Sequence, residues 1–560
     1  MEKPRLTELV DLEKDIVPYD ISMIYAGVGA GKNSIIVGYH DDDTDYMGLA
    51  EKYRVLLITS RKAKVKETKN DKSGRKMLSD VRNMNHIKWD KLKQKSVICT
   101  NAHFQKRIAD WWEPLFDDKP FWEEFDFVVI DEFHSIVTDA TFAGSSCIIY
   151  YLIEHLYNEC IKRNKDKRHK TKIVLMSGTP EPAEPLLEKY NTHILDHRAD
   201  ALSISPDEYC IFNYQKALKQ LLTTLQNGKK AAYYLTVFDK LEDIISEALK
   251  IGIKEEQIVV SVSDAKINKM LKKNYKKIFE NKEPFETSLA KEKIPDEYLL
   301  VITNSKNKEG INIKTKVETL VLETHFNPDI MQICGRFRNG IDSVIIVSDA
   351  RQFEIQPFYD EEANYQWNYA VETANLYLNQ IFEEEHLDPL EESVYPNERV
   401  MKFIKYIENS TRFIRYNPFK NKFDANHCFL QAYDFYNKSI NDFELFIDDP
   451  TRITLYEPSK SISIRIRRNY SDLDEAIEDY FFKKQYNIEK TIFTKQDGVQ
   501  MLSDLNELLR TTSKNPKVYT QLKSILKVFG YDMQRIGKTE KGQFIIVRFK
   551  KDSEESGETD

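Results

Sequence analysis

Residues Ala26–Ser34 read AGVGAGKNS, a glycine-rich stretch that contains one lysine. Backbone N–H groups of such a loop can surround phosphate oxygens, and its lysine neutralises the outer phosphates. The next residue is usually a serine or threonine whose hydroxyl binds Mg²⁺, but here it is Asn33. An amide oxygen is also a neutral hard donor for Mg²⁺. We therefore expect a phosphate site with bound Mg²⁺, made of Gly27, Gly29, Ala30, Gly31, Lys32, Asn33 and Ser34.

Two adjacent carboxylates, Asp131 and Glu132, follow an apolar run in FVVIDEFH (127–134). Unpaired charges are costly to bury, so packing alone does not explain them. At the end of a strand beside a phosphate loop they have a chemical use. Asp131 would hold Mg²⁺, and Glu132 would polarise an attacking water.

A third stretch, QICGRFRNG (332–340), carries Arg336 and Arg338. Phosphoryl transfer gains rate from positive charge placed on the transferring phosphate, and a separate domain can supply that charge when two domains close. Taken alone, the stretch also fits a surface loop that carries arginines.

The elements that would position these residues are short, unalternated apolar runs. In the first series the runs are DISMIYAGVG, YRVLLITS, KSVICTN, FDFVVIDEFH and KIVLMSGTP. Such runs are typical of buried parallel strands joined by helices. A second series contains KKAAYYLTV, EQIVVSVS, EYLLVITNS, KVETLVLET and DSVIIVSDA. The pattern predicts two successive α/β domains, 1–200 and 201–352, with the ligand beyond the carboxyl ends of the strands.

The remaining third of the chain differs in composition. Residues 353–490 are predicted to be mainly helical, and 491–551 to form a small α+β module with a helix followed by a hairpin. That module fits either a winged-helix unit or a cap that only packs on the core. The tail 552–560 is acidic and is expected to be disordered.

Composition excludes several classes of protein. The chain has 560 residues, 41% of them hydrophobic and 31% charged, and no apolar run of the roughly 18 residues that would span a bilayer. Its six cysteines include no C-x-x-C pair, which argues against a structural zinc site. The net charge of −8 argues against indiscriminate coating of nucleic acid. We expect a soluble, cytoplasmic protein.

In their order along the chain, AGVGAGKN, VLLITSR, VICTN, VVIDEFH, LMSGTP, LVITNSKNKEGIN and QICGRFR resemble motifs I, Ia, Ib, II, III, V and VI of superfamily 2 DExH-box helicases. The resemblance covers about residues 20–350 and implies two tandem RecA-like domains. The compact GRFR is similar to the ending found in some viral, phage and mobile-element replication helicases.

The resemblance also implies roles for individual residues. Gln332 and Arg336 match the glutamine and first arginine of motif VI. The second arginine of the motif would fall at Asn339, so Arg338 can replace it only if the loop here is one residue shorter. Residues that couple hydrolysis to movement would be His134, Ser177, Thr179, Gly310 and Asn312. Gly178 stands where alanine is more usual. Nucleic acid would contact Thr59, Ser60, Arg61, Thr100, Asn101, Thr303 and Asn304, whose polar groups suit phosphate and sugar contacts.

The function that this implies is an ATP-dependent helicase or translocase on nucleic acid, with DNA favoured over RNA. Two alternatives stay open. One is a nucleotide-gated clamp that unwinds little, because Asn33 and motif VI depart from the family pattern. The other is an origin-binding replication initiator, for which the C-terminal region would have to read sequence.

Overall fold

In the computed structural model, the chain divides into two compact units. One contains residues 1–442 and 455–459, and the other 443–454 and 460–560. The residues described are 4–41, 44–60, 65, 78–80, 96–112, 122, 125–140, 144–158, 171–198, 201, 206–262, 269–289, 292–304, 313–352, 361–387, 397–441, 444–447, 453–455, 463–466, 477, 480–481, 484, 486, 491–512, 521–528, 531–535 and 544–548.

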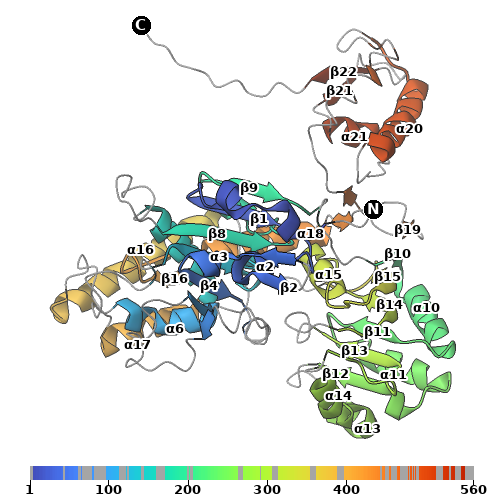
Figure 1. The fold of residues 1–560 in the computed structure, drawn as a ribbon, viewed down its shortest axis with the longest axis horizontal. Coiled ribbons are helices and arrows are strands. Elements are labelled where there is room, and N and C mark those ends of the chain that lie inside the picture. The colour runs from blue at the N-terminus through green and yellow to red at the C-terminus, as the bar shows by residue number, and fades with distance from the viewer. Residues whose placement is uncertain are drawn as a thin grey trace. The chain divides into compact units, whose positions relative to one another are not determined.

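The first domain is built on a parallel sheet with the strand order β5-β6-β4-β7-β8-β1-β9 (Figure 1). Its strands are β1 (Ile21–Tyr25), β4 (Val55–Thr59), β5 (Leu78–Asp80), β6 (Ser96–Thr100), β7 (Phe127–Asp131), β8 (Lys172–Ser177) and β9 (His193–Asp196). Every residue of β1, β4, β6 and β7 is buried, which explains why these runs do not alternate between apolar and polar residues. The strands β5 and β9 were not predicted.

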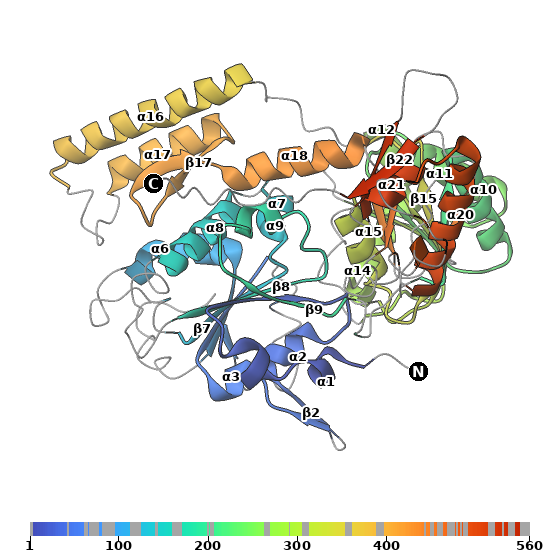
Figure 2. The same cartoon turned by 90° about the horizontal axis from the view of Figure 1, so that it is seen from above.

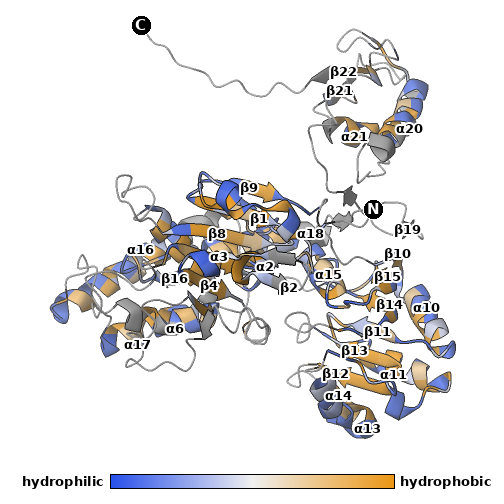
Figure 3. Ribbon diagram, in the orientation of Figure 1, coloured by the Kyte–Doolittle hydropathy of each residue, from blue (hydrophilic) through white to orange (hydrophobic). Residues whose placement is uncertain are grey.

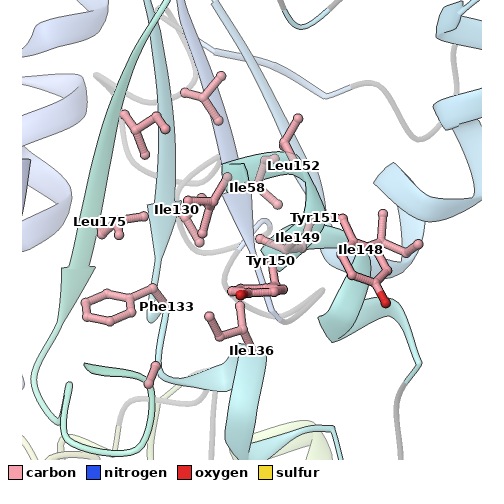
Figure 4. Close-up of a cluster of buried hydrophobic side chains, with 14 of the residues drawn as sticks. Ile58, Ile130, Phe133, Ile136, Ile148, Ile149, Tyr150, Tyr151, Leu152 and Leu175 are labelled. Atoms are coloured by element: carbon pink, nitrogen blue, oxygen red, sulfur yellow. The ribbon is translucent and has the colours of Figure 1, made fainter. Parts of the chain in front are cut away.

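Helices cover both faces of this sheet (Figure 2). The domain contains α1 (Leu6–Leu9), the π-helix η1 (Leu12–Ile16), α2 (Lys32–Val37), the hairpin β2 (Tyr39–Asp41) and β3 (Thr44–Tyr46), α3 (Leu49–Lys52), α6 (Asn101–Trp112), α7 (Ser135–Thr138), α8 (Ser145–His155) and α9 (Glu184–Leu187). Leu56 and Ile58 of β4 pack with α8, whereas Val55 and Leu57 pack with α2. Figure 4 shows the first of these cores, where Ile130, Phe133 and Ile136 meet the side chains of α8.

The second domain repeats this arrangement with the parallel strand order β12-β13-β11-β14-β15-β10. The strands are β10 (Glu208–Phe212), β11 (Ala231–Tyr234), β12 (Ile258–Ser261), β13 (Leu300–Thr303), β14 (Val317–Leu322) and β15 (Ile341–Val347). They are mostly apolar, while the helices around them have polar outer faces (Figure 3). β10 takes the place beside β15 that β1 takes beside β8, although its sequence EYCIF was not among the predicted runs.

The helices of the second domain are α10 (Tyr214–Gln226), α11 (Leu241–Lys250), the short 3₁₀ helix η6 (Glu255–Gln257), α12 (Lys269–Asn274), α13 (Lys276–Glu280), α14 (Lys282–Leu289) and α15 (Asn327–Cys334). The amphipathic α10 begins where the side chain of Asn213 accepts a hydrogen bond from Lys216 N–H.

Glu323, which follows β14, is a buried carboxyl inside the second domain and is 2% exposed. It accepts hydrogen bonds from Tyr233 Oη at 3.0 Å and Thr236 N–H at 2.8 Å. Burial raises the pKa of Glu323 from 4.5 to about 7, because these hydrogen bonds only partly offset the loss of water, and the charge of Asp239 adds a smaller increase.

This raised pKa predicts a pH-dependent stability. Between pH 4.5 and 7 the folded chain holds a proton on Glu323 that the unfolded chain releases, so stability is greatest below this window and falls as the pH rises, by roughly 3 kcal/mol. Glu323→Gln should remove this part of the pH dependence, which calorimetric unfolding at pH 5 and pH 8 would measure. Glu318→Gln, on β14 just before Glu323 but only partly buried, is the control. An unchanged pH slope in Glu323→Gln would contradict the assignment.

The rest of the first unit consists of α16 (Glu361–Glu384), α17 (Glu398–Ser410), a hairpin of β16 (Ile414–Asn417) and β17 (Lys422–Ala425), and α18 (His427–Asn441). α16, α17 and the hairpin share a small core that includes Leu378, Ile404 and Phe423. The α18 helix instead joins the core of the first domain.

The second unit has its own core. It contains the paired strands β18 (Glu444–Ile447) and β20 (Ser463–Ile466), then α20 (Lys495–Thr512), α21 (Leu522–Val528) and an antiparallel hairpin of β21 (Tyr531–Arg535) and β22 (Phe544–Arg548). β19 (Ile453–Leu455) lies where the chain returns to the first unit. Phe481, Phe493, Leu526 and Phe544 are buried together in this core.

The predicted fold class is therefore confirmed: two tandem RecA-like parallel-sheet domains are followed by a mostly helical region and a small α+β module. The domain limits given above stay a prediction, and the tail 552–560 lies outside the described residues. Among the residues described, no helix combines the length and the apolar character needed to cross a membrane.

Candidate nucleotide site between two domains

The glycine-rich loop follows β1 and leads into α2. Gly29 and Gly31 have φ angles of 88° and 97°, in the left-handed region that residues with a Cβ rarely adopt. A Cβ built on Gly31 would meet nothing within 4 Å, so the backbone conformation rather than lack of space requires glycine there. Turns of this kind bring successive N–H groups to one side, where they can surround an anion. The conformation therefore fits phosphate binding.

Lys32 lies across this loop and is 9% exposed. Its Nζ donates hydrogen bonds to the carbonyl oxygens of Ala26 at 2.8 Å and Gly27 at 3.3 Å. The same ammonium lies 3.8 Å from Glu132 Oε1. The structure thus brings the lysine of the loop and the second carboxylate of FVVIDEFH together, as a nucleotide site requires.

Gly178 explains how the segment after β8 fits against the loop. A Cβ at this position would lie 3.2 Å from the carbonyl oxygen of Ala26 and 3.6 Å from Lys32 Nζ. Such a distance to a backbone oxygen is tight, so an alanine would force the loop to shift. The glycine that replaces the more usual alanine thus lets residues 177–179 approach the phosphate loop closely.

Asp131 is the last residue of β7 and is buried, whereas Glu132 is partly exposed. Glu132 has a φ of 53°, a left-handed conformation that is unusual for a residue with a side chain. Strained backbone of this kind costs about 1–3 kcal/mol and is concentrated at functional sites. The carboxylate of Glu132 lies 3.8 Å from Lys32 Nζ and 3.4 Å from His134 Nδ1.

His134 connects this carboxylate to the segment after β8. Its Nδ1 lies 3.4 Å from Glu132 Oε2 and 2.8 Å from Ser177 Oγ. Ser177 Oγ also accepts a hydrogen bond from the backbone N–H of Thr179 at 3.0 Å. With a proton on Nδ1, His134 can donate to Glu132 or to Ser177. In the other tautomer Nδ1 can only accept a hydrogen bond from the Ser177 hydroxyl, so a hydrogen bond to the carboxylate requires the Nδ1–H form.

The second domain reaches the same carboxylate through α15. Gln332 Nε2 donates a hydrogen bond to Glu132 Oε2 at 3.3 Å, across 200 residues of sequence. Arg336 Nη2 donates to Gln332 Oε1 at 3.3 Å. The backbone N–H of Arg338 bonds to Ile313 O at 2.8 Å, which fixes the turn after α15. Gln332 therefore contacts Glu132 directly, and Arg336 contacts Gln332.

A second contact between the domains was not predicted. A Cβ built on Gly335 would lie 2.4 Å from Cβ and Cγ1 of Val28, in the middle of the phosphate loop. Glycine is thus the residue that lets the end of α15 reach the loop. Sequence reasoning also missed Arg198, which donates to Glu181 Oε1 at 2.5 Å and to Asp196 Oδ1 at 2.8 Å. Gly335 lies within QICGRFR but was given no role there, and Arg198 lies outside the motifs quoted above.

The predicted nucleic-acid contacts lie at the carboxyl ends of β4, β6 and β13. Thr59, Thr100, Asn101 and Asn304 are buried, while Ser60 and Thr303 are partly exposed. The Thr303 hydroxyl donates to Ser261 O at 3.0 Å. Arg61, Gly310 and Asn312, which were also predicted as site residues, lie outside the described residues. The roles of this set stay predictions.

A scan with protein-family models found no match, and a search of curated protein sequences found none. Among solved structures, the chain is similar to the DUF1998 helicase MrfA bound to DNA and AMPPNP, with 14% identity and a TM-score of 0.39 over 59% of this chain and 46% of that one. It is also similar to S. cerevisiae Dbp5 bound to RNA and ADP BeF3, with 14% identity and a TM-score of 0.33 over 61% of this chain and 81% of that one. The chain spans about half the length of MrfA. At these scores, the evidence for the fold is the strand order described above.

Proposed function

We propose that this chain is an ATP-driven helicase or translocase of the DExH-box type, which moves along a nucleic-acid strand, DNA in preference to RNA. The observation that carries the proposal is the convergence on Glu132. Lys32 of the phosphate loop, His134 of the first domain and Gln332 of the second domain all lie within 4 Å of its carboxylate oxygens. A carboxylate that both domains contact is suited to hydrolysis that depends on domain closure.

The residues at this site fit ATP and Mg²⁺. The left-handed glycines and Lys32 suit the phosphates, and the oxygens of Asp131 and Asn33 are hard donors of the kind that Mg²⁺ takes. Bound Mg²⁺ would neutralise charge on the β- and γ-phosphates. Glu132 would orient the attacking water, Gln332 would hold Glu132 in place, and Arg336 would supply positive charge near the γ-phosphate when the domains close.

The test is steady-state ATP hydrolysis with and without single-stranded DNA or RNA. Turnover that is stimulated by DNA or by RNA would support a nucleic-acid motor and identify its substrate. Because the coupling is reciprocal, ATP analogues should also tighten binding of that strand. Nucleotide-dependent strand binding without turnover would instead support the clamp, and equal hydrolysis with and without nucleic acid would contradict the proposal.

Asn33 is predicted to serve in place of the usual hydroxyl. Asn33→Ala should raise the Mg²⁺ concentration needed for half-maximal hydrolysis several-fold, because the metal loses one oxygen ligand. Asn33→Thr, which supplies a hydroxyl, should return this concentration to the wild-type value. A Mg²⁺ titration of turnover measures both. Ser34→Ala, one residue along the same helix and also predicted to lie at the phosphates, is the comparison: it can change KM for ATP but should leave the Mg²⁺ requirement unchanged. If Ser34→Ala raises the Mg²⁺ requirement and Asn33→Ala does not, the loop presents the Ser34 side chain to the metal instead.

A further inference from the structure

The α18 helix belongs to the first domain although it comes more than 200 residues after it in sequence. Cys428, Phe429 and Ala432 are buried in the same core as α8, and Tyr433 and Tyr436 pack against that core. These residues form one face of the helix because they recur every three or four positions. The α18 helix also packs on α7, which follows His134, and on α9, which follows Thr179 (Figure 2). It is therefore fixed to the segments that carry the first domain's part of the site.

The carboxyl-terminal half of α18 contacts the second domain. Tyr436 stacks on Phe326, with ring centroids 4.2 Å apart and an interplanar angle of 15°. Phe435 meets the same ring edge-on, at 5.3 Å and 89°. Phe326 is buried and is the N-cap residue that precedes α15. The two aromatic residues of α18 thus pack on the N-cap residue of α15, the helix that carries Gln332 and leads to Arg336.

The α15 helix consequently meets elements of the first domain at both of its ends. At its start, Phe326 lies against Tyr436, and at its end, Gly335 lies against Val28 of the phosphate loop. Gln332 lies between these contacts and donates to Glu132. A helix held at two points cannot pivot about one of them, so the stack on Phe326 restricts the orientation in which Gln332 and Arg336 are presented.

We propose that Tyr436 and Phe435 are positioning residues that act through Phe326 on α15, so that the region after the second domain sets how readily the two domains close on nucleotide. This inference rests on the proposed function for its catalytic readout. The side chains that pack on the Phe326 ring belong to the same chain, so the effect needs no partner protein.

The experiment uses the full chain and two readouts. In the first, Tyr436→Ala is expected to lower kcat for ATP hydrolysis and its stimulation by nucleic acid about tenfold, with KM for ATP within about twofold of wild type. Tyr436→Phe, which keeps the ring, should restore both. Tyr436→Ala should have no further effect in a Phe326→Leu background, because the two residues act as one unit. Tyr406→Ala, an exposed tyrosine on α17, is the matched control.

The second readout does not depend on hydrolysis. Donor and acceptor dyes on Glu188→Cys and Lys219→Cys, which are exposed positions in the first and second domains, report closure by energy transfer. The cysteines in the described residues are buried, and Cys160 would be replaced by serine. Tyr436→Ala should shift the distribution of energy-transfer efficiencies away from that of the wild type, and Tyr436→Phe should leave it unchanged. If the wild-type protein does not hydrolyse ATP, the proposed function is wrong. The comparison of energy transfer in wild type and Tyr436→Ala would still test this inference. Unchanged turnover and unchanged transfer in Tyr436→Ala would overturn the inference alone.

Discussion

Replacing Glu132 with glutamine will lower kcat for nucleic-acid-stimulated ATP hydrolysis about 1,000-fold, with little change in KM for ATP. Glutamine keeps the size of the side chain and one acceptor oxygen, so the hydrogen bond from Gln332 can persist. It lacks the negative charge that lies 3.8 Å from Lys32 and that would polarise the attacking water. The loss therefore tests the charge of this group rather than the shape of the site.

The backbone at Glu132 gives a second variant of the same test. Its φ of 53° is strained for glutamate but not for glycine. Glu132→Gly should thus be as inactive as Glu132→Gln while the free energy of unfolding of the first domain stays equal or rises by about 1 kcal/mol. Glu188→Gln, an exposed glutamate in the same domain, is the control for loss of a charge. Full turnover in either Glu132 variant would remove this residue from the mechanism.

The sheets could be predicted from sequence because strands buried on both faces leave continuous apolar runs. Each run that was predicted as a strand corresponds to one of the parallel strands, from β1 to β15. β9 was missed because it lies at the sheet edge, where alternate residues of HILD are exposed, and β5 because it is only three residues long. β10 was missed because Glu208, Tyr209 and Cys210 do not form a Val- or Ile-rich run. Short or edge strands owe their conformation to pairing rather than to their own composition.

The candidate site could be predicted as a set of residues but not as an arrangement. The motifs place Lys32, Glu132 and Gln332 in order along the chain, yet nothing in the sequence says that Gln332 donates to the carboxylate while Arg336 donates to Gln332. That choice depends on how α15 approaches the phosphate loop, which is decided by a glycine and a valine that carry no chemistry. The same holds for Tyr436, whose significance comes only from the ring of Phe326 beside it.

Gly335 therefore offers a test of the domain contact in which no catalytic side chain is itself replaced. Gly335 has a φ of −64°, an ordinary helical conformation, so alanine fits its backbone. The added methyl would lie 2.4 Å from Val28 Cβ, however, which no real contact allows, so α15 or the loop must move when the domains close. A displacement of about 1 Å at a reacting centre can cost about 100-fold in rate. Gly335→Ala should thus lower kcat about 100-fold without lowering the unfolding temperature, as steady-state kinetics and calorimetry would measure.

The clash predicts its own suppressor. Val28→Gly removes the Cβ that the new methyl would meet, so Val28→Gly/Gly335→Ala should recover turnover relative to Gly335→Ala, and the double-mutant cycle should show strong coupling between the two positions. A merely structural effect of either substitution would add to the other instead of cancelling it. If Gly335→Ala retains wild-type turnover, then α15 and the phosphate loop do not approach this closely in the hydrolysing state, and Gln332 must reach Glu132 from a different domain orientation.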